Sequence, residues 1–472
     1  MISFFVSIAV LIIAYHTFGR VVSGVFEPDD RATPAISNPD GVDFVPMKAW
    51  KAFLVELLNI AGTGPIFGAL MGACFGPVVF IWIVIGGVLA GAVHDYMIGM
   101  ISMRNNGESI AELSGRYLGK PLMWVMRVFS VLLLILTGTV FVNSPAALIA
   151  DLTPWANDTM VWVVVILAYY ILATLLPIDK VIGKFYPIFG AVMLIMAFCI
   201  TGAIIFGDYH LPELTLENLH PEGLPIWPYM FVTVACGAIS GFHATQAPMI
   251  SKCLMKESDG RHVFYGAMLK ESVIALVWAA GGVAFYGATG GLNNALATLG
   301  QSGTVYEMSM GMLGRFGGIL AVIGVVVCPI TSGDTAFRSA RLILSEVTGL
   351  DQKPMKNRLL ITIPLLGIAT LLTQLDFAVL WRYFSWSNQT LAMITLWTIT
   401  AYLLRENKNP WASLISAVPG TFMTAVSVTY ILIAKEGLRL GKGFSYTAGA
   451  VAATAVFAVY LFYAGRKKKL GK

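Results

Sequence analysis

The sequence carries very little charge for its length. Only 12% of its 472 residues are Asp, Glu, Lys or Arg, whereas 57% are hydrophobic. A soluble domain contains roughly 25% charged residues, because its elements keep one face in water. The composition therefore excludes an ordinary soluble globular protein.

Cysteine is also scarce, and motifs for catalysis are missing. The five cysteines form no Cys-x-x-Cys pair and lie in or beside apolar segments, so we expect small buried residues rather than disulfides or a metal cluster. No P-loop ends in Lys-Ser or Lys-Thr, which argues against ATP as the energy source. The sequence also shows no nucleophile–base pair of the kind that would indicate an intramembrane enzyme. We therefore expect no catalytic residues, no cofactor and no metal site.

Long apolar runs are abundant. Many reach roughly 20 residues, the length that crosses ~30 Å of hydrocarbon, and they predict an all-α polytopic membrane protein with about thirteen transmembrane helices. The predicted spans are 1–19, 50–75, 76–101, 122–151, 159–178, 184–206, 227–253, 261–288, 315–347, 356–376, 378–404, 411–434 and 445–464. The first run has no basic stretch before it and no cleavage site after it, so we interpret it as a retained span.

The basic residues predict the orientation. Most of the 31 Lys and Arg fall in alternate connections and in the tail after span thirteen, and Lys and Arg resist translocation. The opposite side includes loop 207–226, which has acidic residues but no Lys or Arg. We therefore expect the N-terminus outside and the C-terminus in the cytoplasm, in the cytoplasmic (inner) membrane. The tail Arg466–Lys469 is interpreted as an anchor at the lipid surface, not as a nucleic-acid site.

Two spans contain Gly and Pro where a helix should be interrupted. These segments are 60–65 and 236–248, and we expect the second half-helices to begin at Pro65 and Pro248, a position that proline favours. Unpaired backbone cannot face lipid, so such breaks line a cavity or pack within protein. Simple kinks are the alternative.

The arrangement of the two breaks indicates a duplication. Each broken span opens a set of five, and segments 109–120 and 304–315 downstream of them match at Glu, Ser, Leu and Gly without gaps. Because five is odd, the second unit is inverted, as in secondary transporters with a midplane site. The predicted parts are an extra helix with a cytoplasmic loop (1–49), a first repeat (50–206), an extracellular loop (207–226), a second repeat (227–404), and two helices with the tail (405–472).

Four motifs carry a family resemblance. Segments 60–65, 235–246, 329–338 and 381–390 closely resemble the carbon starvation protein A (CstA) family. The resemblance implies the amino acid–polyamine–organocation superfamily, a LeuT-type core of five plus five helices, and uptake of peptides, or of pyruvate in some members, during starvation. Long members carry paired histidines where this chain has Glu56–Asn59, and they have further C-terminal helices.

The breaks supply candidate substrate ligands. Backbone N–H groups at the start of a half-helix attract a carboxylate, which pyruvate and every peptide C-terminus possess. The predicted substrate site consists of Gly62, Thr63, Gly64, Ser240, Gly241, Phe242, His243 and Gln246. His243 titrates near neutral pH as a free side chain, but a hydrogen-bonded structural role is the alternative. Phe242 either stacks on substrate or fills space.

Span nine supplies candidate coupling residues. An intramembrane carboxylate such as Asp334 is costly and usually functional, although a structural pair with Arg338 is the alternative. Thr331 and Thr335 share a helix face, and with first-break carbonyls they resemble a sodium site of the family's fold. The predicted cation or proton site consists of Ile60, Ala61, Thr331, Ser332, Asp334 and Thr335.

Other polar residues are given simpler interpretations. We expect Lys270 and Glu271 to neutralise each other, and His94-Asp95 alone is too small a set for a metal site. The sequence thus predicts a transporter coupled to H⁺ or Na⁺, with a channel or a membrane sensor as rival classes. It leaves open peptide or pyruvate, proton or sodium, and the oligomeric state.

Overall fold

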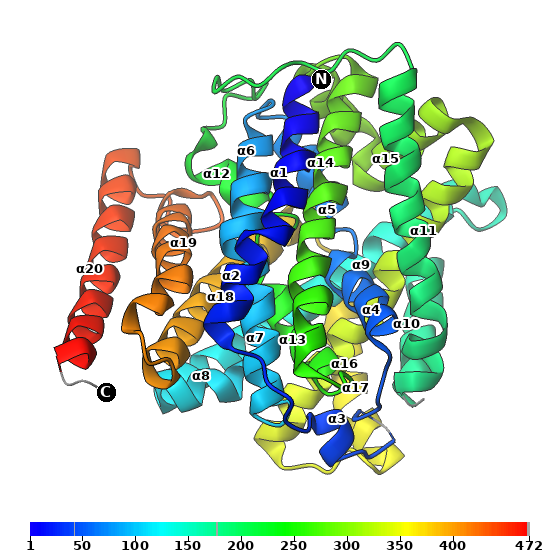
Figure 1. The fold of residues 1–472 in the computed structure, drawn as a ribbon. Helices are drawn as coiled ribbons and strands as arrows, with labels where there is room; N and C mark the ends of the chain where they lie inside the picture. The colour runs from blue at the N-terminus through cyan, green and yellow to red at the C-terminus, as the bar shows by residue number, and fades with distance from the viewer. Residues whose placement is uncertain (42, 176–177, 470–472) are drawn as a thin grey trace.

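Helices form nearly all of the protein in the computed structural model, which describes residues 1–41, 43–175 and 178–469 (Figure 1). The first half comprises α1 (Ile2–His16), α2 (Phe18–Phe26), α3 (Pro34–Ser37), α4 (Ala49–Ala61), α5 (Gly64–Ala73), α6 (Val79–Ile85), α7 (Ala92–Arg104), α8 (Ile110–Leu118), α9 (Lys120–Leu152), α10 (Thr159–Leu175) and α11 (Ile178–Phe206). The second half comprises α12 (Ile226–Thr233), α13 (Gly241–Ser251), α14 (Gly266–Tyr286), α15 (Thr289–Val322), α16 (Cys328–Thr348), α17 (Met355–Leu372), α18 (Phe377–Glu406), α19 (Leu414–Ile433) and α20 (Lys442–Lys469). Short π-helices are η1 (Gly86–Gly91), η4 (Arg261–Tyr265) and η5 (Ile323–Val327), and short 3-10 helices are η2 (Pro154–Ala156), η3 (Glu257–Asp259) and η6 (Pro410–Ser413).

The apolar helices make this a multi-pass membrane protein. Within the described ranges, nine helices are long and apolar enough to cross a membrane, or up to ten if the bent pair α4 and α5 counts as one span. Three predicted spans lie outside this set: α10 is short, α12 and α13 are separated, and α18 carries Arg382 and several amides. The prediction of about thirteen spans stays a prediction. Large apolar side chains such as Phe198, 79% exposed, face outward, as lipid contact requires.

Both predicted interruptions are present. Helix α4 ends at Ala61, α5 begins at Gly64, and their axes differ by 47°. Helix α12 ends at Thr233, and the chain is not helical again until Gly241. Pro65 lies in the first turn of α5, as predicted. The prediction for Pro248 is wrong, because α13 begins seven residues earlier and holds this proline inside; Gly241 and its tight packing, not proline, determine the start.

The packing of the helices repeats itself between the two halves. Helix α5 packs on α14, and α13 packs on α7; α4 packs on α11, and α12 packs on α18. The contact of α9 with α18 corresponds to that of α16 with α11. The contact of α10 with α16 corresponds to that of α17 with α9. The broken helices lie in the middle of this arrangement (Figure 1). Helices α1, α19 and α20 lie outside it.

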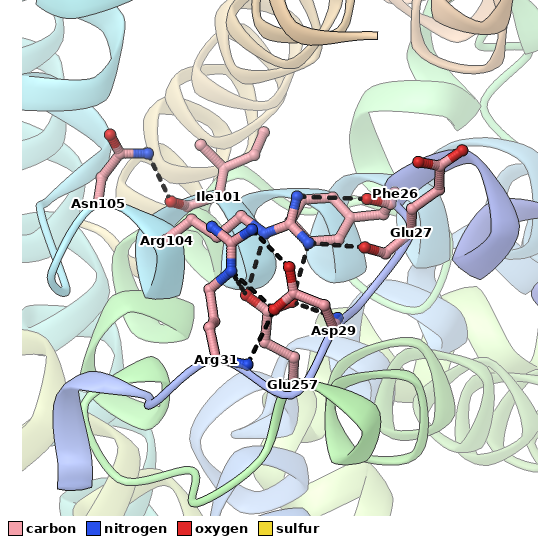
Figure 2. A network of polar contacts seen from close by, with 8 residues as sticks. All are labelled: Phe26, Glu27, Asp29, Arg31, Ile101, Arg104, Asn105 and Glu257. Carbon is pink, nitrogen blue, oxygen red and sulfur yellow. Dashed lines mark hydrogen bonds and ion pairs between the residues drawn. The ribbon is translucent and has the colours of Figure 1, made fainter. Parts of the chain in front are cut away.

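The two ends of the chain lie at opposite ends of the helix bundle (Figure 1). The N-terminal amine pairs with Glu213 in the connection before α12. At the other end, a polar network ties the segment after α2 to the end of α7 and to η3, and Figure 2 shows two arginines converging on Glu257. Arg104 donates to both oxygens of Glu257, at 3.0 and 2.9 Å, and Arg31 lies 3.6 Å from the same carboxylate.

Candidate functional site

The first break depends on Gly62. Its backbone has φ 46° and ψ −133°, a conformation that side chains make costly. A Cβ atom there would lie 2.6 Å from Cζ of Phe141 on α9, so the ring occupies the space that any side chain would need. Ile60, Ala61 and Thr63 beside it are buried. The break is therefore enclosed by protein, as unpaired backbone in a membrane must be.

The second break is held together by Asn388 of α18. Its Oδ1 accepts from the backbone N–H of Phe242 at 2.7 Å and from the hydroxyl of Ser240 at 3.1 Å. Its Nδ2 donates to the carbonyl of Ala235 at 3.3 Å. One amide thus replaces part of the hydrogen bonding that the helix gives up. The sequence places Asn388 in the motif 381–390 but does not indicate its contacts with the second break.

The two breaks lie next to each other. Helix α13 packs on α4, and a Cβ atom on Gly64 would lie 2.4 Å from Sγ of Cys236. A Cβ atom on Gly241 would lie 2.3 Å from a backbone oxygen of α18. The structure thus brings the predicted substrate residues Gly62–Gly64 and Ser240–His243 into one buried region. Their role in binding stays a prediction.

The remaining predicted substrate residues lie at the edges of this region. Phe242 is 1% exposed and packs edge-to-face on Phe141 with ring centroids 6.1 Å apart, so in this conformation it fills space. Gln246 donates to the hydroxyls of Thr245 and Ser339, at 2.9 and 3.3 Å. It therefore links α13 to α16. A cavity of about 20 Å³ lies beyond this contact, beside Thr245 and Ser339.

The hydroxyl groups of the predicted coupling residues on α16 donate hydrogen bonds either to α4 or to carbonyls of α16 itself. The hydroxyl of Ser332 donates to the carbonyl of Leu58 at 2.8 Å, which joins α16 to the last turns of α4. The hydroxyls of Thr331 and Thr335 donate to carbonyls of their own helix, at 2.7 and 2.9 Å. Contact between the first break and α16 is therefore present. Cation binding there stays a prediction.

Asp334 is buried near a positive charge. One carboxylate oxygen lies 4.0 Å from Nη2 of Arg338, one turn further along α16, and this guanidinium donates to the carbonyl of Ala173 on α10. Both side chains are 1% exposed. Asp334 and Arg338 thus lie at ion-pair distance, as the structural alternative expects. The coupling role of Asp334 stays a prediction.

A chain of ionisable groups crosses the second break. His94 and Asp95 on α7 are joined at 2.7 Å, Asp95 is joined to Nδ1 of His243 at 2.8 Å, and Nε2 of His243 lies 3.4 Å from Glu271 on α14. Sequence analysis found these residues separately but did not connect them. The expected Lys270–Glu271 pair is wrong: Nζ of Lys270 lies over the rings of Tyr15 and Phe53, because adjacent residues of a helix face different directions.

Three buried polar side chains lie in or just before the first break. Glu56, Asn59 and Thr63 are fully buried, and their side-chain oxygens and the amide nitrogen have no hydrogen-bond partner within the described chain. Such groups are costly unless something else satisfies them. Thr63 belongs to the predicted substrate site, and the signal for Glu56 and Asn59 is their spacing of about one helical turn directly before a glycine break.

The fold and the sequence both have relatives. A crystal structure of a mutant manganese transporter from Eremococcus coleocola aligns with a TM-score of 0.54 at 12% identity, covering 91% of this chain and 98% of that one. An uncharacterized membrane protein of Haemophilus influenzae is 42% identical over 61% of this chain and 91% of its own length. The first similarity concerns the fold alone.

Relatives with functional names include two that name different substrates. The peptide transporter CstA of Bacillus subtilis is 26% identical over 83% of both chains. The pyruvate/proton symporter BtsT of Escherichia coli is 28% identical over 57% of this chain and 47% of its own length, so this chain matches less than half of that protein. The family model described as carbon starvation protein CstA matches residues 1–165, 153–284 and 279–430. The chain therefore belongs to the CstA carbon starvation protein family.

Proposed function

We propose that this chain is a secondary active transporter that takes up peptides across the cytoplasmic membrane during nutrient starvation, driven by a cation gradient. The observation that carries the proposal is the buried meeting of two helix breaks within a multi-pass protein of this family. A relative named peptide transporter favours peptides. A relative named pyruvate/proton symporter favours a second candidate, symport of a small monocarboxylate.

The proposed core consists of two inverted repeats, residues 50–206 and 227–404. Exchanging α4–α11 for α12–α18 turns several packing pairs into others that are present: α5 with α14 becomes α13 with α7, and α9 with α18 becomes α16 with α11. Two unrelated halves would have no reason to preserve this correspondence. It supports a site near the midplane at the repeat interface, with alternating access around it.

The proposed ligand for the substrate carboxylate is the backbone of the breaks. Helices α5 and α13 both begin there, and their first N–H groups carry the positive end of the helix dipole. Thr63 adds a buried hydroxyl without a partner in the described chain. Because these groups are closed off from solvent, uptake requires the contacts around the breaks to open.

The proposed binding region for a coupling sodium ion is the contact between α4 and α16. Carbonyls of Ile60 and Ala61 end one helix there, and hydroxyls of Thr331, Ser332 and Thr335 lie on the other, with Asp334 beside them. Such hard oxygen ligands suit an alkali cation. For a proton, Asp334 is the candidate within this set.

Uptake into proteoliposomes tests the function. We expect purified full-length protein to accumulate a labelled dipeptide above its external concentration when a proton or sodium gradient is imposed, with saturation. Pyruvate in place of the dipeptide separates the two candidates. Flux that never exceeds equilibration would indicate a channel, and binding without flux would indicate a sensor; either result would contradict the proposal.

A further inference from the structure

Four ionisable side chains from three helices form one continuous buried chain beside the helix breaks. The order is His94, Asp95, His243 and Glu271, with contacts of 2.7, 2.8 and 3.4 Å. All four are no more than 1% exposed. Burying this many ionisable groups is expensive, and membrane proteins keep such groups where they do chemistry.

The contact between His243 and Glu271 requires a proton on one of the two groups. The carboxylate of Asp95 accepts hydrogen bonds from Nδ1 of both histidines, so Nδ1 of His243 carries hydrogen. Its Nε2 then faces an oxygen of Glu271 at 3.4 Å. Two bare lone pairs would repel each other at this distance, so either the imidazole or the carboxyl group holds a proton.

With that proton on His243, the carboxyl group of Glu271 is free to take a further one. Neither oxygen makes a hydrogen bond of ordinary geometry within the described chain, although the backbone of Gly237 in the break faces it. By contrast, both oxygens of Asp95 are occupied by imidazoles. Proton exchange is therefore easiest at Glu271, with His243 as its partner and Asp95 fixing the imidazole.

We propose that His243, Asp95 and Glu271 form the proton-binding centre of this transporter, with Glu271 as the group that loads and releases the transported proton. The inference rests on the proposed function and adds the identity of the proton carrier. It assigns this task to the second break rather than to Asp334, which lies beside Arg338 on α16.

The protonation step is simple to balance. With imidazolium between two carboxylates, the three groups carry one net negative charge. A proton from the outer solution forms an O–H bond on Glu271 and brings the net charge to zero. After the protein opens inward, that bond breaks and the proton passes to cytoplasmic water. No other bond forms or breaks.

Neighbouring charges explain why the proton and the substrate would travel together. Glu56 on α4 is buried within electrostatic range of Asp95, His243 and Glu271, and the thiol of Cys236 lies against His243. A substrate carboxylate in the break would meet several negative groups in a medium of low dielectric constant. Protonating Glu271 removes one of them, so an anionic substrate binds best to the loaded centre.

A metal ion is the rival occupant. Cys236, His243 and Glu271 offer one ligand atom each, all within 4.8 Å of one another. However, Sγ of Cys236 donates to the hydroxyl of Ser240 at 3.5 Å, which requires a protonated thiol, whereas a metal requires a thiolate. The hydrogen-bonding arrangement therefore favours the proton.

Neutralising Glu271 separates substrate movement from proton movement. The full chain is reconstituted into vesicles with a labelled dipeptide or pyruvate, whichever the wild type transports. Two rates are measured: substrate counterflow without a pH gradient, and substrate accumulation with a pH gradient. A pH-sensitive dye inside the vesicles reports proton entry during accumulation. We expect Glu271→Gln to keep counterflow within a few-fold of wild type and to lose both accumulation and proton entry. Glu257→Gln is the matched control, a buried glutamate in the same segment that should keep accumulation.

The outcomes are distinct. Accumulation at the wild-type level by Glu271→Gln overturns the inference. Loss of accumulation in Asp334→Asn, with accumulation kept in Glu271→Gln, overturns it as well. A stoichiometric transition metal in the purified protein, absent from His243→Gln, also overturns it. If Glu271→Gln aggregates, Asp95→Asn replaces it, with the same expected separation. A wild type that exchanges neither substrate overturns the proposed function itself, whereas exchange without proton entry overturns only the inference.

Discussion

At the scale of single residues, Thr63 offers a direct test of the substrate site. Its hydroxyl is buried at the first break without a hydrogen-bond partner in the described chain, so Thr63→Val removes no internal bond and keeps the side-chain shape. If the hydroxyl contacts the substrate carboxylate, its loss costs about 1.5–3 kcal/mol of binding. We expect KM for uptake to rise by roughly one order of magnitude or more at that cost.

The matched control is Thr137→Val, since Thr137 on α9 is equally buried but donates to its own helix at 2.7 Å. Its KM should stay close to that of the wild type. Equal KM values for both variants and the wild type would remove Thr63 from the binding site.

Some residues of the site follow from local sequence, and others do not. Gly62 and Pro65 act on their own backbone, so their effect on the helix is evident without a fold. His243, Asp95 and Glu271 become one group only when α7, α13 and α14 pack together, and nothing in their separate segments specifies that contact. Asn388 is invisible for the same reason, because its partners belong to another helix.

At the scale of elements, the network around Glu257 should stabilise the junction of α2, α7 and η3 (Figure 2). Glu257 is 1% exposed and meets Arg104, whose side chain is 16% exposed. We expect Glu257→Gln to cost about 2 kcal/mol, since a charged hydrogen bond of this kind contributes roughly 1.5–3 kcal/mol. Thermal unfolding of the detergent-solubilised protein should show a lower Tm.

The control for this element is Glu108→Gln, because Glu108 pairs with Arg116 in an exposed position where ion pairs contribute roughly 0–1 kcal/mol. A larger decrease in Tm in Glu108→Gln than in Glu257→Gln would contradict the assignment.

Asp29 joins the network from the loop, and the Arg31 side chain hydrogen-bonded to it holds the pKa of Asp29 below the ordinary value of 3.8. Its contribution is therefore complete above about pH 4 and is lost only as the pH falls further.

Element boundaries show where sequence reasoning stops. The interruption at 60–65 was predicted to within a residue because glycine and proline coincide there. In the second interruption they are spread out, and proline marked the wrong end: α13 begins at Gly241, whose missing side chain admits the backbone of α18. That close approach is a property of tertiary packing, so no rule about isolated helices would find it.

At the scale of the whole molecule, the proposed duplication rests on sequence features that tolerate errors. It depends on counting spans and on matching segments 109–120 and 304–315, both of which survive errors of several residues at each boundary. The count itself is harder, since α10, α12, α13 and α18 are too short, interrupted or polar to qualify by length and apolarity. Helix α13 is buried throughout by its neighbours and needs no apolar surface of its own, whereas α10 exposes Val164 and Leu172 and is only too short.

Labelling of two engineered cysteines tests part of the predicted count. Seven predicted spans lie between residues 217 and 468, and an odd number of crossings would place these two residues on opposite sides of the membrane. In intact bacteria, a membrane-impermeant maleimide should label Glu217→Cys in the acidic connection but should label Lys468→Cys only after permeabilisation. Background is low because Cys74, Cys236, Cys253 and Cys328 are buried, and half-buried Cys199 can be replaced by alanine. Labelling of both positions from outside would mean an even number of crossings between residues 217 and 468 and would contradict the seven spans predicted there.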